Sequence, residues 1–161
     1  MFRLHKNDRS QTDPEPYKRR LGAGLVPGGR HALRAGYFLA LMPGGGSWVR
    51  AGRFTPTPPE LAAIRQEIHY DSAGFHRVIE APEILQHFPG GLDLSAPQLT
   101  RPPRGYEATD PGLPFLKLKS FGLNSYFSDA DVLAPDFIDQ AVARLVAAQP
   151  WVAFLNRALA E

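Results

Sequence analysis

The chain has 161 residues, of which 43% are hydrophobic, and its 18 Lys and Arg against 16 Asp and Glu leave a net charge of +2. This length is typical of one domain and supplies enough apolar material for a single core. The absence of cysteine excludes disulfides, a thiolate nucleophile and a Cys-ligated metal, while 16 Pro and 15 Gly exclude a plain helical bundle.

No targeting or membrane signal is visible in the sequence. The N-terminal residues are polar where a signal peptide needs an apolar stretch, and no run approaches the ~18 apolar residues of a membrane helix. We therefore expect a cytoplasmic protein that does not enter membranes. Basic residues gather in residues 1–34 and 101–128, so they can form a local patch on a nearly neutral molecule.

The first elements are predicted to be the strands of an antiparallel meander in residues 20–54. Strand-forming residues at 36–42 lead into a Pro-Gly-Gly-Gly turn at 43–46, and a second such run follows at 47–54. Glycines tolerate the positive φ angles that a hairpin turn needs. The pattern therefore predicts a hairpin at this turn.

Short helices are predicted next, because helix-start signals recur in residues 57–91. Thr57 followed by Glu60 is a capping box, and Asp71 with Ser72 starts a second helix. A third short helix is expected to run from Pro82 to the Pro-Gly-Gly sequence at 89–91. The Pro-rich residues 97–114 are typical of an extended loop.

The C-terminal third is predicted to hold one strand and then helices. Residues 115–121 alternate with period two, which places Leu116 and Leu118 on one face of a strand and two lysines on the other. Ser128 with Asp131 caps a short helix, and an amphipathic helix and a final helix follow, separated by Pro150. The amphipathic helix is expected to bury Ile138, Ala141, Val142 and Leu145, and the aromatic residues expected in the core are Trp48, Phe75, Phe88, Trp151 and Phe154.

These elements predict an α+β fold. An antiparallel sheet, formed by the meander and the later strand, packs with several short helices and a C-terminal helix pair. The chain is expected to be one domain, residues 1–161, with residues 1–19 a truncated or flexible N-terminal segment.

Sequence signatures of cofactor and metal sites are missing. No nucleotide-binding glycine motif opens a helix, and neither a nucleophile elbow nor a zinc-binding His pair on a helix occurs. His69 and His76 lie seven residues apart, but a helix restart at Asp71 separates them. We expect no cofactor and no metal, and the sequence leaves open whether the protein is an enzyme.

Clustered basic residues are the strongest candidate site. Arg101 and Arg104 flank a Pro-Pro pair, whose stiffness lowers the entropy lost when a guanidinium binds a carboxylate or phosphate. Lys117 and Lys119 share one face of the predicted strand, and an anion between them would relieve their repulsion. A solvated strand face is the alternative interpretation of these two lysines.

A third basic segment, residues 8–20, carries a resemblance to a known family. The segment is similar to a D-x-R-F-S-x-D-K-x-P-Y-K motif of a bacterial and fungal family catalogued as domain of unknown function 2461. Arg9, Asp13, Pro16, Tyr17 and Lys18 match, and further similar stretches lie at 36–45, 101–106, 116–121, 133–137 and 154–156. The resemblance implies an α+β fold and no particular activity. Because members are usually longer, we expect this chain to lack most of their N-terminal helical region.

The leading hypothesis is a binding pocket or active site for a phosphate- or carboxylate-bearing small molecule. It predicts that the three basic segments converge, with Asp13 or Tyr17 as the candidate proton-transfer group. The residues expected to bind the anion are Arg9, Lys18, Arg101, Arg104, Lys117 and Lys119.

Two alternatives from other functional classes stay open. Basic residues interleaved with aromatic ones, such as Tyr126, are also found in proteins that contact nucleic acid, although the acidic C-terminal third argues against it. The other alternative is a protein-interaction or assembly module, in which Trp151 and Phe154 of the last helix pack on a partner, including a second copy of the chain in a homodimer.

Overall fold

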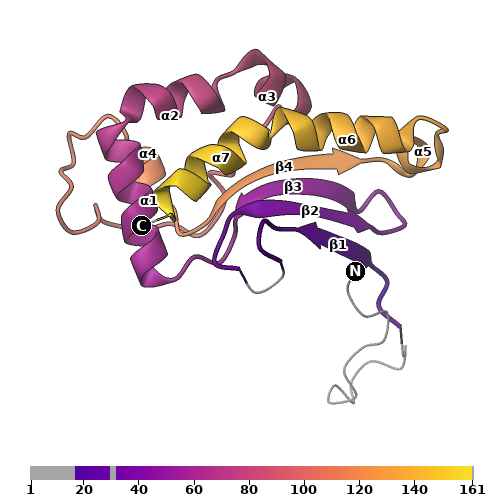
Figure 1. Cartoon of the computed structure of the whole chain (residues 1–161), viewed down its shortest axis with the longest axis horizontal. Helices are drawn as coiled ribbons and strands as arrows, with labels where there is room; N and C mark the ends of the chain where they lie inside the picture. Colours follow the sequence, from indigo (N-terminus) through magenta and orange to yellow (C-terminus); the bar gives the residue numbers. More distant parts are fainter. Residues whose placement is uncertain (1–16, 30–31, 161) are drawn as a thin grey trace.

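Four strands form one antiparallel sheet in the order β1-β2-β3-β4 (Figure 1). The computed structural model describes residues 17–29 and 32–160. The strands are β1 (Leu21–Leu25), β2 (Gly36–Leu41), β3 (Ser47–Arg53) and β4 (Phe121–Phe127). The first three are consecutive, so the meander is confirmed, and β4 joins the sheet beside β3 after a long excursion of the chain.

The helices all lie on one face of this sheet (Figure 1). Helices α6 and α7 pack on β3, and α1 and α2 pack on α7. The result is a two-layer α+β fold, as the sequence predicts. The helices are α1 (Pro58–Tyr70), α2 (Ser72–Ile79), α3 (Pro82–His87), α4 (Leu113–Leu116), α5 (Asp129–Leu133), α6 (Phe137–Ala147) and α7 (Gln149–Ala158).

The core fills the space between the helices and the sheet. From the sheet, Val49, Ala51 and Leu123 are fully buried, and from the helices Phe75 and Trp151 are. Phe88 and Phe154 are also buried in this core, as expected. Trp48 is not part of it, because its place in β3 turns it to the helix-free face, where it is half-buried.

The predicted helix starts are confirmed by their caps. The Glu60 carboxylate accepts a hydrogen bond from the Thr57 backbone N–H at 2.6 Å, and Asp71 accepts one from Gly74 N–H at the start of α2. Ser128 and Asp131 form the reciprocal capping box of α5. Each cap satisfies backbone N–H groups that the first helical turn leaves free.

The strand predicted at residues 115–121 is wrong. Pro114 lies in the first turn of helix α4, where a missing N–H costs nothing, and the chain then forms a single bridge between Gln98 and Leu118. The buried positions of Leu116 and Leu118 come from this helix end and bridge. The strand itself begins only at Phe121, so Lys117 and Lys119 precede it.

The amphipathic helix α6 buries a different face from the one expected. Phe137 and Ala141 face the core, whereas Ile138 and Val142 are 66% and 50% exposed. The helix packs on the sheet through Phe137, whose ring centroid lies 5.1 Å from that of Phe127 in β4. The remaining apolar stripe is therefore directed away from β4 and from the core.

No helix of the described residues is both long enough and apolar enough to cross a membrane.

The last helix, α7, bears on the expectation that its aromatic residues pack on a partner. Trp151 and Phe154 are 0% and 3% exposed, so they belong to the protein's own core and are not available to a partner.

Candidate functional site

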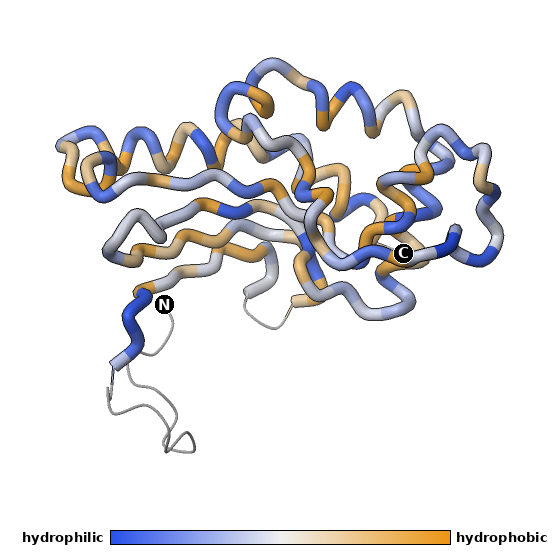
Figure 2. The backbone as a smooth tube through the Cα atoms, turned by 180° about the vertical axis from the view of Figure 1, so that it is seen from behind, coloured by the Kyte–Doolittle hydropathy of each residue, from blue (hydrophilic) through white to orange (hydrophobic). Residues whose placement is uncertain are grey.

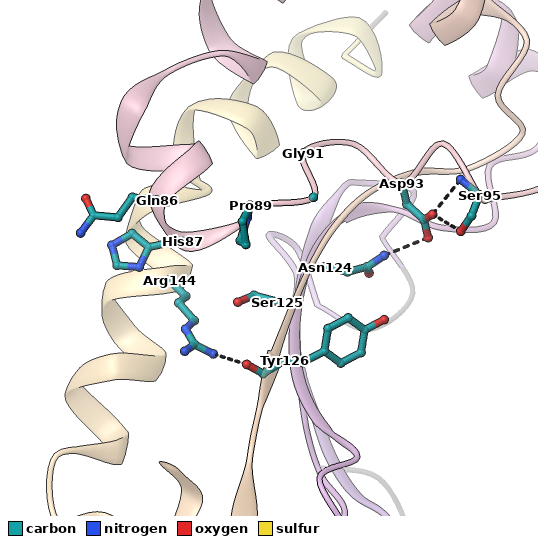
Figure 3. A pocket seen from close by; sticks show the side chains of 11 residues that line it. Gln86, His87, Pro89, Gly91, Asp93, Ser95, Asn124, Ser125, Tyr126 and Arg144 are labelled. Carbon is teal, nitrogen blue, oxygen red and sulfur yellow. Dashed lines mark hydrogen bonds between the residues drawn. The ribbon is translucent and has the colours of Figure 1, made fainter.

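A cavity of about 630 Å³ lies along the outer edge of β4 (Figure 3). It is bounded by β4, by helix α6 and by the end of α3 with the loop that follows it. This volume suits a small organic molecule. The lining residues that carry polar side chains are Gln86, His87, Asp93, Ser95, Asn124, Ser125, Tyr126 and Arg144.

The loop after α3 forms one wall because it is tied to β4. Leu92 forms a bridge with Leu123, and the Asp93 N–H donates to the Gly122 carbonyl at 3.1 Å. The loop leaves β4 after this contact, so the strand edge beyond it opens into the cavity. Alternation along β4 then presents Asn124 and Tyr126 on one side of the strand and Ser125 on the other (Figure 3).

Asp93 is held by three hydrogen bonds at this wall. Its carboxylate accepts from the Ser95 hydroxyl at 2.5 Å, from the Ser95 N–H at 3.0 Å and from the Asn124 amide at 2.9 Å. The Ser95 hydroxyl bond and the other donors outweigh the effect of burial and lower the pKa of Asp93. Asp93 is therefore a fixed carboxylate whose main role is to orient Asn124.

Asn124 has an unused acceptor. Its Nδ2 group donates to Asp93, while its Oδ1 atom is buried and has no hydrogen-bond partner among the described residues. A buried carbonyl oxygen without a donor is costly, and most such groups in native proteins are paired. The cross-strand neighbour of Asn124, Arg50 on β3, has a buried Nε that also lacks a partner among the described residues, so this donor, and not a ligand in the cavity, is the group placed to pair with Asn124 Oδ1.

Arg144 of α6 supplies the positive charge of the cavity. Its guanidinium carbon lies 3.5 Å from the centroid of the Phe127 ring, and its Nη1 donates to the Tyr126 carbonyl at 2.9 Å. Burial lowers the pKa of Arg144 and the Asp131 carboxylate raises it, but an arginine stays charged at neutral pH. The stacked guanidinium keeps further N–H groups for a carboxylate or phosphate.

His87, the last residue of α3, adds an imidazole to the same lining. It is the candidate for proton transfer, since it is the one imidazole in the lining formed by the described residues. No cluster of metal-ligating residues is found in the described part of the chain. The two histidines noted in the sequence bind carboxylates instead: His69 contacts Asp110 at 2.7 Å, and His76 contacts Glu80 at 2.8 Å.

None of the basic residues singled out in the sequence that the structure describes lines this cavity. Two of the predicted segments lie together, because the Leu99 N–H donates to the Lys117 carbonyl at 2.8 Å and the Lys119 N–H to the Pro97 carbonyl at 2.9 Å. Arg101 and Arg104 follow in the same loop. Lys117 is half-buried, and the other three cations are exposed.

The first basic segment lies elsewhere. Tyr17 and Lys18 are exposed and enter β1 through a strongly hydrophilic stretch (Figure 2). In register, Leu21 pairs with Leu41 near the α5 end of the sheet, whereas Lys119 precedes Phe121 at the α1 end. The two ends are about 20 Å apart along a seven-residue strand. Lys18 and Lys119 do not converge, and Arg9 and Asp13 lie outside the described residues.

The residues of the β4 cavity were missed in the sequence for a simple reason. Asp93, Asn124 and Arg144 come from a loop, a strand and a helix that are separated by 20 residues or more. The available signal was the alternation of residues 121–127, where Phe, Leu, Ser and Phe alternate with Gly, Asn and Tyr. That pattern predicts the strand, but only the fold shows what lies beside its edge.

Comparison with known proteins gives one match. A family model described as a conserved hypothetical protein (DUF2461) matches residues 1–154. No match was found among curated proteins or among solved structures.

Proposed function

The chain belongs to the DUF2461 family of conserved hypothetical proteins, and on that premise we propose that it binds a small organic anion in the cavity along β4. The observation that carries the proposal is the position of Arg144, whose guanidinium is stacked on Phe127 and donates to the Tyr126 carbonyl at the cavity wall. Stacking fixes the plane of the guanidinium, so little entropy is lost when it binds an anion.

The second part of the proposal concerns the rest of the ligand. The loop wall of the cavity carries the Asp93 carboxylate, which keeps its negative charge, and the exposed Ser95. A bare inorganic anion would leave the acceptor groups of this wall unused. A molecule that carries a carboxylate or phosphate at one end and hydroxyl or amino groups at the other satisfies both walls, and hydroxy acids and sugar phosphates have this chemistry.

Thermal shift with a panel of inorganic phosphate, citrate and ribose 5-phosphate tests the proposal. A ligand present at 100 times its Kd adds about 2.7 kcal/mol, which raises the Tm by several degrees. We expect the organic anions to raise it and Arg144→Gln to abolish the shift. Arg77→Gln is the matched control, because Arg77 is an exposed helical arginine outside the cavity lining.

Variants of the other basic cluster separate the two candidate locations of an anion site. Lys117→Ala and Arg104→Ala should leave the shift unchanged if the ligand sits along β4. If these two variants abolish the shift and Arg144→Gln does not, the anion site is the loop cluster predicted from the sequence. The absence of any shift across the panel would reject anion binding at both places.

The helix-free face of the sheet supports a second candidate, contact with single-stranded nucleic acid. Here the Arg50 guanidinium lies 4.4 Å from the Trp48 ring centroid, and Tyr126 is 59% exposed on the neighbouring strand. Aromatic rings and arginine planes on a sheet are surfaces on which bases stack. The test is Trp48 fluorescence with a uridine oligonucleotide: quenching that weakens steeply with salt supports this function, and unchanged fluorescence contradicts it.

A further inference from the structure

The helical layer leaves strands β1 and β2 uncovered. Helices α6 and α7 pack on β3, and no helix of the described residues packs comparably on β1 or β2, which lie farther from α6 in Figure 1. Leu25 of β1 pairs with Tyr37 of β2, and Tyr37 pairs with the buried Ala51 of β3, so all three face the helical side of the sheet. Part of the apolar face of the sheet therefore lacks the layer that covers the rest.

Two hollows lie along this uncovered face. The first, of about 620 Å³, is bounded by β1, β2 and α6 and is lined in part by Leu25. The second, of about 370 Å³, lies beside α5 and is lined in part by Leu21, at the other end of β1. Leu21 and Leu25 are four residues apart on the same face of β1, so the hollows follow one line about 14 Å long. We call the two hollows together the β1–α6 groove.

The side chains that border the groove are apolar and exposed. Val142 and Val146 of α6 lie one helical turn apart, line the first hollow, and are 50% and 60% exposed. Leu25 on the opposite side of that hollow is 53% exposed. Exposed apolar side chains that are contiguous over several elements mark a place where another molecule packs. The groove therefore fits an apolar surface of a partner.

The spacing of the strands identifies a helix as the occupant. The axes of two packed helices lie about 8–10 Å apart. Strands β1 and β3 are separated by two strand spacings, or about 9.6 Å. Because α6 packs on β3, a helix packed beside α6 would lie over β1 and fill the groove. Three turns of helix, about 16 Å long, match the length of the groove.

Charge distinguishes the two ends of the groove. Lys18 and Arg19 line the end beside α5. The one carboxylate that the described residues contribute to this end, Asp129, already accepts hydrogen bonds from the Gly44 and Gly45 N–H groups at 2.9 Å. None of the described residues that line the other end is charged. A helix with acidic side chains at one end is therefore complementary in one direction only.

We propose that the β1–α6 groove binds an amphipathic helix of a partner protein. The helix lies alongside α6, directs an apolar stripe with spacing i, i+3, i+4 and i+7 into the groove, and places Asp or Glu beside Lys18 and Arg19. It completes the layer that α6 and α7 begin. The groove lies beside β1 and the anion cavity beside β4, so this proposal does not depend on the ligand of that cavity.

Selection from a phage-displayed library of helical hairpins, randomised on the outward face of one helix, tests the proposal on the full chain. We expect the selected helices to carry the apolar stripe and acidic residues at one end. Val142→Lys/Val146→Lys should raise their Kd by about tenfold or more, because two charges then enter an apolar contact. Leu85→Lys is the matched control, since Leu85 is a 44% exposed apolar residue of α3, and it should leave the Kd within about twofold.

A charge reversal tests the direction of the helix. Lys18→Glu should weaken binding of the selected helices, and the loss should shrink as salt concentration rises. Arg77→Glu is the control, because Arg77 is exposed on α2 and lies outside the groove lining. Binding that both variants leave unchanged would contradict the proposed direction.

Hydrogen exchange and sedimentation distinguish the helix from other occupants. A helix in the groove makes no hydrogen bonds with the edge of β1, so the outer β1 amides should exchange as in the free chain; slower exchange would show an added strand and overturn the proposal. A dimer of the chain alone that Val142→Lys/Val146→Lys dissociates would identify a second copy as the occupant and also overturn it. So would a selection that yields no helix sensitive to these substitutions. Circular dichroism confirms that the variants fold.

Discussion

Replacing Glu60 tests how the helical layer is fixed to the sheet. The Glu60 carboxylate accepts from Arg53 Nε at 3.1 Å and Nη2 at 3.0 Å, and also from the Thr57 N–H. Arg53 ends β3 and Glu60 lies in the first turn of α1, so this contact sets the angle at which the helix leaves the sheet. The side chains of Arg53 and Glu60 are only 17% and 9% exposed.

Glu60→Ala removes both functions of the carboxylate. Breaking a buried ion pair costs about 3–5 kcal/mol, and the partial exposure of Arg53 places this case at about 3 kcal/mol. Loss of the helix cap adds about 1 kcal/mol. We expect urea unfolding at pH 7 to show a loss of about 3–4 kcal/mol, whereas Thr57→Ala, which keeps the ion pair, loses about 1 kcal/mol or less.

The pKa of Glu60 determines how this stabilisation changes with pH. Burial alone would raise the pKa of Glu60, but hydrogen bonds from Arg53 and Thr57 outweigh it and lower the pKa below the ordinary value of 4.5. The stabilisation is therefore complete above pH 4.5 and is lost as the pH falls through the lower, folded-state pKa. Glu60→Gln should remove this loss of stability at acid pH. A Glu60→Ala variant whose free energy of unfolding at pH 7 lies within 0.5 kcal/mol of that of the original protein would refute the reasoning. So would a Glu60→Gln variant that loses stability at acid pH as the original protein does.

Three further substitutions have expected effects that differ in size. Trp151→Ala empties a fully buried site and should cost about 3–5 kcal/mol in urea unfolding, so a loss under 1 kcal/mol would contradict the core assignment. Gly52→Ala should cost more than about 2 kcal/mol, because φ is +142° there and a Cβ would lie 2.0 Å from the Phe121 carbonyl oxygen; an unchanged Tm would show that the backbone moves freely. Arg157→Gln should cost less than about 1 kcal/mol despite its 2.6 Å contact with Glu67, since Arg157 is 57% exposed, and a larger loss in thermal unfolding would show that this surface pair is unusually strong.

Much of the fold could be predicted from local chemistry. Helix starts depend on contacts within four residues, so Thr57 with Glu60 and Ser128 with Asp131 are recognisable in the sequence and are confirmed. The hairpin at 43–46 is likewise local, because Gly44 and Gly45 adopt φ angles of +84° and +73°. These features do not depend on what the rest of the chain does.

The failures came where two local explanations compete. The alternation of Leu116 and Leu118 with lysines suits a strand, but Pro114 is also a good first-turn helix residue, and the helix forms. Ile138 and Val142 have helical spacing, which shows that they share a face but not that the face is covered. Which side of α6 meets the sheet is decided by packing over a long sequence distance.

The candidate site was less accessible than the fold. Whether an arginine is a good anion ligand depends on the neighbours that hold its guanidinium in place. For Arg144 these neighbours are the ring of Phe127 and the carbonyl of Tyr126. Both belong to a strand that ends 17 residues earlier in the chain. Clusters of charge along the sequence, such as Arg101 and Arg104, draw attention because they are local, although the cavity lies elsewhere.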